Sequence, residues 1–303
     1  MAVFGLAKPK ILFDTNVVRD MFRSRQGRDE ATLERIRART VALTDAGAIR
    51  PVMTQPVLWE LGSILDDTAS GEGGREIHEK VVRFYLELTH ERLMLHEHER
   101  QRIEIEVGMP LRDHQVIVDA PLDYWLGNAL DQEWSRKHLE QLHAAKDADR
   151  AEERKKREDT RAEFQKRFGD AWEEGFADML APATWEATIT KNTADEIRKF
   201  ATKEKLVRRG RAMPPPRAAR TFWYGESFYF SKARHVFVAR PEKDLLSNSA
   251  IKSTPDLVDM THLRDSAYFN VMVSSDVNLL AVAREARVST RFLTFEEFAR
   301  DLT

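Results

Sequence analysis

The chain has 303 residues, of which 48 are Lys or Arg, 50 are Asp or Glu and none is Cys. Lack of Cys excludes disulfides, zinc–thiolate sites and thiol catalysis, and 42% hydrophobic residues exclude a disordered chain. The length allows a compact core with a substantial insertion, and the near balance of charge means that any charged binding surface must be local.

The N-terminal segment shows no targeting pattern. It has no basic n-region followed by a long apolar run, and it enters a strand-like sequence at once. No run of about 18 apolar residues occurs elsewhere. We therefore expect a cytoplasmic protein with no membrane span.

The first part of the chain alternates between strand-like and helix-like segments. Apolar residues at 10–13 predict a buried strand that ends at Asp14. Amphipathic helices should follow, and then a second strand over 49–53 and a helix over 56–65. This order favours a parallel sheet with right-handed crossovers.

The composition changes twice along the rest of the chain. A glycine-rich turn at 70–74, a helix over about 75–91 and a brief strand at 93–95 complete a first core segment, residues 8–95. Residues 96–250 consist mainly of long charged helical stretches, which indicate an inserted region.

The last segment, residues 251–303, returns to the earlier alternation. Its expected elements are, in order, a helix over about 256–269, a strand over 270–273, a helix to about 286 and a strand over 291–293. Thr294 and Glu297 predict a capping box for a final helix. The whole pattern predicts an α/β fold with a central parallel sheet flanked by helices and a large, mostly α-helical insertion.

Carboxylates stand where this fold would gather them. Asp14 follows the first strand, Glu60 lies on the helix after the second, and Asp276 follows the strand that ends at Val273. In a parallel sheet the carboxyl ends of the strands meet at one edge, where ligands usually bind. Asp259, in the first turns of the preceding helix, can reach the same edge.

Four carboxylates at one edge predict a metal site. They would repel one another, and their pKa values would rise unless a cation neutralised them. Oxygen ligands suit a hard ion such as Mg²⁺ or Mn²⁺, which accepts phosphate oxygens. Two ions about 3.5–4 Å apart can activate a water and stabilise a leaving oxygen, so we expect phosphodiester hydrolysis.

Four segments resemble the acidic motifs of PIN-domain nucleases. They are ILFDTN at 11–16, QPVLWEL at 55–61, DMTHL at 259–263 and VSSD at 273–276. By this resemblance, which covers about half of the chain, the metal ligands would be Asp14, Glu60, Asp259 and Asp276. It further implies that Thr15 and Asn16 orient the first acid and that Ser274 or Ser275 supplies the hydroxyl before the last acid.

The resemblance implies a metal-dependent endonuclease. RNA is favoured over DNA only because the resembled family acts mostly on RNA. An antitoxin or regulatory protein partner and self-association are further expectations. The alternative is a catalytically silent PIN-like module that binds nucleic acid or protein. An aspartyl-phosphotransfer enzyme is disfavoured, because Asn16 stands where a second Asp would be expected.

Each acid also has a plainer interpretation. Asp14 and Asp276 are placed where they would cap helices, and Glu60 could face solvent. Asp259 is preferred as the third acid because its spacing to Asp276 resembles that of the family. The neighbouring acids Asp256 and Asp265 remain alternatives for that position.

A basic segment and an aromatic segment lie in the predicted insertion. Residues 198–220 contain nine Lys and Arg and one acid, Glu204, which indicates either a phosphate-binding arm or a solvated helix end. Aromatic residues at 222–224 and 228–230 could stack on bases, but core packing or an oligomer contact is favoured. No metal role is expected for His96, His98 or His114.

Overall fold

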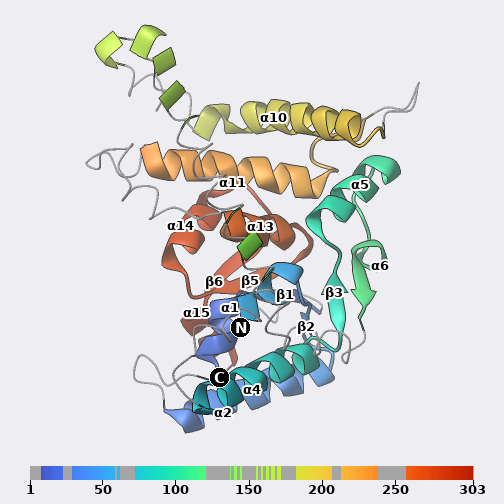
Figure 1. Ribbon diagram of the computed structural model, residues 1–303, viewed down its shortest axis with the longest axis vertical. Coiled ribbons are helices and arrows are strands. Elements are labelled where there is room, and N and C mark those ends of the chain that lie inside the picture. The colour runs from blue at the N-terminus through green and yellow to red at the C-terminus, as the bar shows by residue number, and fades with distance from the viewer. Residues whose placement is uncertain are drawn as a thin grey trace.

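The computed structural model describes residues 8–22, 29–58, 60–61, 72–120, 182–206, 213–237 and 257–302, with scattered residues between 137 and 171. Figure 1 shows a central sheet with helices packed around it. Within the described part of the chain, no helix is long and apolar enough to cross a bilayer.

The main sheet is parallel and has four strands. Their order is β2 (Arg50–Pro51), β1 (Lys10–Phe13), β5 (Val271–Ser274) and β6 (Arg291–Thr294). The central strands pair from Ile11 with Val271 to Phe13 with Val273. The paired residues 11–13 and 271–273 are apolar and fully buried, as expected for a sheet covered on both faces. The predicted α/β architecture with a parallel sheet flanked by helices is confirmed.

A second, smaller sheet adjoins β2. Strand β3 (Arg92–Met94) pairs antiparallel with β4 (Ile117–Asp119), and an isolated parallel bridge joins Met53 to Leu93. Strand β4 lies within the segment that the sequence indicated to be helical. Its three residues, two of them exposed, are too few to produce a recognisable alternation of polar and apolar positions.

One group of helices packs around the first and last strands. Its members are α1 (Thr15–Asp20), α2 (Glu30–Asp45), α4 (Glu72–Leu88) and α15 (Phe295–Leu302). Helix α15 contacts β5, β6 and α2, and α4 contacts α1 and α2. Helix α4 begins three residues earlier than predicted and includes two glycines that were assigned to a turn.

The end of the chain follows the predicted pattern closely. The hydroxyl of Thr294 accepts a hydrogen bond from the Glu297 backbone N–H (3.1 Å), and the Glu297 carboxylate accepts one from the Thr294 N–H (2.7 Å). This reciprocal arrangement is the predicted capping box. It fixes the start of α15, whose Phe298 ring then packs on Phe13 of β1 with the ring centroids 5.2 Å apart.

A second group of helices lies on the other side of the sheet. It consists of α5 (Glu97–Val107), α6 (Asp113–Val116), α10 (Pro182–Lys203), α11 (Arg220–Phe237), α13 (Leu257–Asp265), the 3₁₀ turn η2 (Ser266–Tyr268) and α14 (Val277–Glu285). A further 3₁₀ turn, η1, spans Gly169–Ala171. Helix α11 contacts α10, α13 and α14, and it crosses the molecule beside α10 in Figure 1.

The aromatic residues of α11 belong to the hydrophobic core. Trp223, Tyr224, Phe228 and Phe230 are all at most 8% exposed and join the same apolar cluster as the strands. This confirms core packing over base stacking. Because α11 buries these rings against the rest of the fold, it is an integral part of the core although it lies within residues 96–250.

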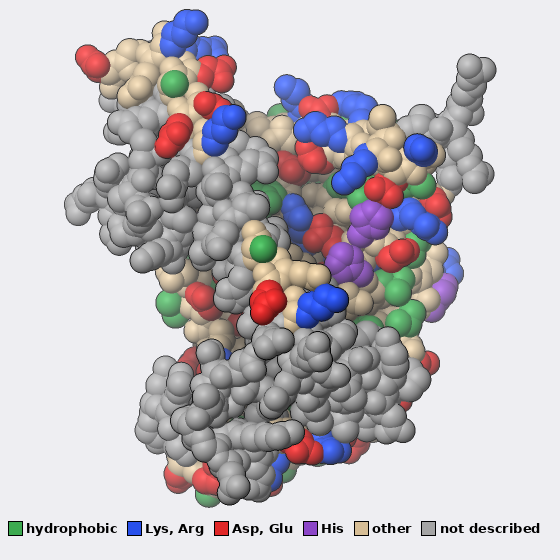
Figure 2. Space-filling model, in the orientation of Figure 1, with side chains coloured by type: hydrophobic (Ala, Val, Ile, Leu, Met, Phe, Trp, Pro, Cys, Tyr) green, Lys and Arg blue, Asp and Glu red, His purple; other side chains and the backbone are tan. Residues whose placement is uncertain are grey.

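The basic segment is partly neutralised where the structure describes it. Arg198 and Lys199 pair with Asp195 and Glu196 one turn earlier on α10. Figure 2 shows Lys and Arg interspersed with Asp and Glu over this helix. Such pairs are typical of a solvated helix face. Residues 207–212, with three of the nine cations, lie outside the described residues.

A buried ionic network joins α5 to α11 and α13. Arg100, only 1% exposed, pairs with Asp265 at the end of α13. One turn along α5, Glu104 accepts hydrogen bonds from the Thr221 backbone and hydroxyl (both 2.9 Å) and from the Tyr268 hydroxyl. These bonds offset part of the cost of burying the two charged groups, although Nε of Arg100 and Oε2 of Glu104 have no hydrogen-bond partner within the described residues. They also fix how α5 meets the core.

Candidate metal centre

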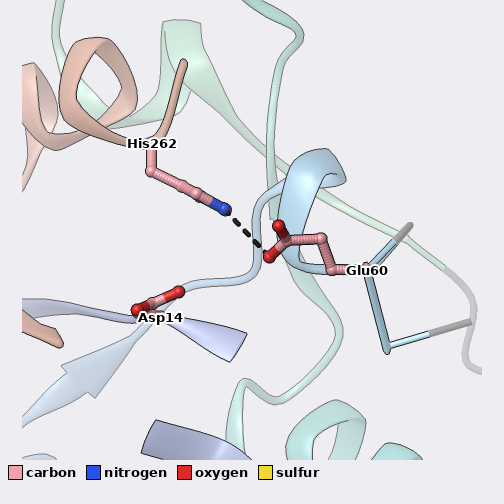
Figure 3. A group of neighbouring side chains, drawn as sticks. All are labelled: Asp14, Glu60 and His262. Carbon is pink, nitrogen blue, oxygen red and sulfur yellow. Dashed lines mark hydrogen bonds and ion pairs between the residues drawn. The ribbon is translucent and has the colours of Figure 1, made fainter. Parts of the chain in front are cut away.

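Three segments that are far apart in the sequence bring ligand atoms together at the carboxyl ends of the strands. Asp14 follows β1, Glu60 lies in the helical residues 55–58 and 60–61 after β2, and His262 projects from α13. One oxygen from each carboxylate and one nitrogen of the imidazole lie within 4.8 Å of one another. Figure 3 shows the three side chains pointing toward a common centre.

Asp14 is held by its backbone, which leaves its side chain available. Its N–H donates to the carbonyl of Val273 on β5 (3.0 Å), and its carbonyl accepts from Val17 and Val18 to start α1. The Asp14 carboxylate makes no capping hydrogen bond, although the residue occupies the N-cap position. The helix-cap interpretation therefore holds for the backbone of Asp14 and not for its carboxylate.

Glu60 faces the site. Its Oε2 atom accepts a hydrogen bond from the Thr15 hydroxyl at 2.5 Å and lies 3.2 Å from Nε2 of His262. The Glu60 side chain is 28% exposed, so it is partly open to solvent at the rim of the site. The sequence assigned Thr15 to the first acid, whereas its hydroxyl orients the second.

Ser274 links the first and last acidic motifs. Its hydroxyl donates to Oδ2 of Asp14 at 2.6 Å and accepts from the backbone N–H of Asp276 at 3.0 Å. Ser275 instead donates to Asp20 at 2.7 Å. Of the two serines, Ser274 therefore contacts the first acid. Asn16, expected to orient that acid, is exposed in the first turn of α1.

Asp276 caps α14 and also acts on the site. Its Oδ1 atom accepts from the backbone N–H groups of Asn278 (2.7 Å) and Leu279 (3.0 Å). Its charge lies near enough to Asp14 to raise the pKa of that carboxyl. Asp276 thus has the capping role, and within the described residues it lies outside the group of ligand atoms that fall within 4.8 Å of one another.

The acids of the third motif differ in their surroundings. Asp259, in the first turn of α13, is half-buried and lies near enough to His262 to raise the pKa of that imidazole. Asp265 is buried at the other end of the helix and pairs with Arg100, which assigns it to the core. Asp256 lies outside the described residues. Asp259 is therefore the better placed of the two described acids to act on the site.

The site concentrates opposite charges in a buried position. Burial raises the pKa of the Asp14 carboxyl, and the nearby Glu60 raises it further, while His262 opposes both. Burial lowers the pKa of His262, but the hydrogen-bonded carboxylate of Glu60, helped by Asp14 and Asp259, reverses this and raises it to about 9. In the absence of a metal, an imidazolium at position 262 is therefore paired with the Glu60 carboxylate at neutral pH.

His262 is the site residue that the sequence did not assign. It stands three residues after Asp259, so both side chains lie on one face of α13. A carboxylate and a His at this spacing are a known way to point two ligands from one helix at one ion. The spacing of three residues between Asp259 and His262 is therefore the feature of the sequence that could have identified His262 as a candidate ligand.

The donor set fits a divalent cation. Two carboxylates supply hard oxygen ligands, and the raised pKa of Asp14 reflects a charge that a cation would stabilise. The imidazole adds a nitrogen donor, which suits Mn²⁺ better than Mg²⁺ among the two ions expected. Asp14, Glu60 and His262 would hold the ion, with Asp259 and Asp276 supplying negative charge around them.

Replacing Ser274 by Ala is expected to weaken the site without unfolding the protein. The substitution removes the hydroxyl that fixes Oδ2 of Asp14 relative to the start of α14. Loss of such a supporting hydrogen bond lowers metal affinity by about 10–100-fold. Calorimetric titration with Mn²⁺ measures the change. Ser275→Ala, which removes the neighbouring hydroxyl, is the matched control, and an equal loss in both variants would contradict the role of Ser274.

The stability of the metal-free protein is expected to fall as the pH rises from 6.5 to 9. The pKa of His262 is raised from 6.5 to about 9 on folding, so its contribution is fully present below pH 6.5 and is lost as the pH passes through 9. The pKa shift corresponds to a loss of at most about 3 kcal/mol in the free energy of unfolding, because solvent reaches Glu60 and weakens the interaction. Urea unfolding in EDTA at several pH values measures it.

The control for this experiment is His262→Gln, which keeps a polar side chain but cannot titrate. Its unfolding free energy should be flatter over the same range of pH. An equally steep decline in the variant would show that another group is responsible.

Comparisons of the chain with protein-family models, curated proteins and solved structures found no match. A functional assignment therefore depends on the residues of the site, their geometry and the resemblance of the four acidic motifs.

Proposed function

We propose that this chain is a divalent-metal-dependent endonuclease with a PIN-like core formed by residues 8–95 and 251–303. The observation that carries the proposal is the convergence of Asp14, Glu60 and His262, whose ligand atoms lie within 4.8 Å of one another at the carboxyl edge of the sheet. All three residues lie in motifs in which an acidic residue was expected to bind metal, and two of them, Asp14 and Glu60, are the expected acids. Two neighbouring carboxylates at this edge, one of them buried, are otherwise an unfavourable arrangement.

The residues of the site have separate tasks in this proposal. Asp14, Glu60 and His262 hold the cation, which when bound polarises a phosphate group and lowers the pKa of a water molecule. Ser274 occupies one oxygen of Asp14 and thereby fixes the direction of the other. Thr15 performs the same task for Glu60. Asp259 and Asp276 keep the local potential negative, which strengthens the binding of a divalent ion.

The proposed substrate is RNA, with DNA as the less favoured polymer, by resemblance to PIN-domain nucleases. An antitoxin or other regulatory protein and a second copy of the chain are the proposed partners. The region between the two core segments would then be the part that distinguishes this protein from a minimal PIN nuclease.

The test is cleavage of a fluorescently labelled single-stranded RNA and a DNA of the same sequence, with Mg²⁺ or Mn²⁺ titrated from zero. We expect metal-dependent cleavage within the RNA, faster with Mn²⁺, and none in EDTA. Binding of RNA without cleavage at any metal concentration would instead identify a catalytically silent module. Cleavage that persists in EDTA would exclude the metal mechanism.

A further inference from the structure

A cavity lies between α10, the start of α11 and the loop that leads into β6. Its volume is about 260 Å³, slightly below the usual range of about 300–1,000 Å³ for small-molecule sites. Three arginines line it: Arg217 just before α11, Arg220 in the first turn of α11, and Arg287 in the loop before β6. The only carboxylate among its lining residues in the described part of the chain is Glu186.

The arginines leave an excess of positive charge in the cavity. Arg217 pairs with Glu186, so these two groups neutralise each other. Within the described residues, neither Arg220 nor Arg287 has a carboxylate within ion-pair distance. Arg220 lies over the Tyr268 ring and Arg287 over the Trp185 ring, with the guanidinium carbons 6.0 and 5.7 Å from the ring centroids. A guanidinium above a ring keeps its N–H donors for an anion, and its planar array of donors matches the oxygens of a phosphate group.

The rest of the cavity wall is apolar and aromatic. Trp223 and Tyr224 are at most 8% exposed, and Ile189 and Val288 complete this part of the lining. The guanidinium of Arg217 lies over the Trp223 ring, 5.3 Å from its centroid. A flat, apolar group could pack against this wall while a charged group meets the two available arginines.

The loop that carries Arg287 is fixed in place. The Tyr224 hydroxyl lies 2.9 Å from the hydroxyls of both Ser289 and Thr290, and the Ser289 backbone N–H donates to it at 3.2 Å. Thr290 also donates to the carbonyl of Ser266 at 2.7 Å. A wall held by these bonds is formed before any ligand arrives, which lowers the entropic cost of binding.

The cavity is separate from the candidate metal centre. Its loop enters the amino end of β6, whereas Asp14 leaves the carboxyl end of β1 in the same parallel sheet. The two sites therefore lie at opposite ends of the strands. A phosphate ion alone would leave most of the 260 Å³ unfilled, so the cavity has room for a ligand that carries a further group.

We propose that this cavity binds a mononucleotide, with its phosphate at Arg220 and Arg287 and its base against the wall formed by Trp223 and Tyr224. The inference does not depend on the nuclease assignment, because none of its residues belongs to the metal centre. It goes beyond that assignment by adding a second ligand site at the opposite edge of the sheet.

The test is calorimetric titration of the full chain with the four ribonucleoside 5′-monophosphates and ATP, in EDTA so that the metal centre is silent. We expect a dissociation constant on the order of 10 µM for at least one nucleotide. Arg220→Gln and Arg287→Gln should each weaken binding about tenfold, since each removes a charge-assisted hydrogen bond. Both side chains are exposed, so neither substitution should unfold the protein.

Arg39→Gln is the matched control. It removes the same charge from an exposed position on α2, which packs against α4 and α15, and it should bind like the unaltered chain. Absence of binding by every nucleotide, or unchanged binding in the Arg220 and Arg287 variants, would overturn the proposal. Adenosine or inorganic phosphate that bound as tightly as the mononucleotide would also overturn it. Markedly tighter binding of a single-stranded oligonucleotide would do so too, because it would identify a strand-binding surface.

Discussion

Replacing Asp14 by Asn is expected to reduce metal-dependent cleavage by on the order of 10³-fold or more, because it removes a central ligand of a site whose ion stabilises charge on the phosphate. The same variant should be at least as stable as the unaltered chain in EDTA. Burial raises the pKa of Asp14, so its ionised form destabilises the metal-free fold, and a neutral amide of similar shape avoids this cost. Cleavage rates and urea unfolding at pH 8 measure the two effects.

Asp119→Asn is a suitable control, since it makes the same chemical change at an exposed position on β4. It should cleave at the unaltered rate. An Asp14→Asn variant that retained activity would remove the basis of the proposed function. If the variant lost activity because it unfolds, its unfolding free energy in EDTA would be lower than that of the unaltered chain, which distinguishes unfolding from loss of a ligand.

The sheet was predictable because its strands carry a strong local signal. Residues 11–13 and 271–273 are short apolar runs followed by polar residues, and such runs are typical of strands buried on both faces. The pairing of β1 with β5 is not specified by these runs, because the two strands lie far apart in the sequence and their order depends on how the intervening elements pack. The strand boundaries differ from the predicted ones by at most two residues, because the ends of elements depend on local contacts that the pattern does not specify.

The candidate site was predictable in part. Asp14 and Glu60 were identified because each stands at a strand end or on the following helix, and Ser274 because it precedes the last acid. His262 was not assigned, since the expectation of oxygen ligands directed attention to the four acids. The alternatives for Asp276 were a cap or a ligand, and its oxygen Oδ1 proves to be a cap.

The packing of the middle region could not be predicted from its composition. Charged helices are compatible with an exposed insertion, and nothing local indicates that Glu104 on α5 would meet Thr221 and Tyr268 across the fold. These contacts join residues more than 100 positions apart, and they depend on the placement of whole helices. Only the aromatic density of α11 gave a correct indication of burial.

Replacing Asp265 by Asn is expected to destabilise the protein by about 3–5 kcal/mol, because it leaves the buried guanidinium of Arg100 without its partner charge. Asp259→Asn, on the same helix but half-buried, should change the stability by less than about 1 kcal/mol. When both variants are folded, Asp259→Asn should lose more cleavage activity than Asp265→Asn. Asp259 lies near His262, whereas Asp265 is paired with Arg100.

Urea unfolding in EDTA, followed by cleavage at a low urea concentration where both variants are folded, separates the two acids of α13. A stable Asp265 variant that had lost metal binding would identify Asp265 as the acid of the third motif, and the assignment of Asp259 would then be wrong. The same measurement tests the buried network as a whole. If Arg100 tolerates the loss of Asp265, water must reach the guanidinium, and α5 would still be held to the core by Glu104 and by the ion pair between Glu97 and Arg264.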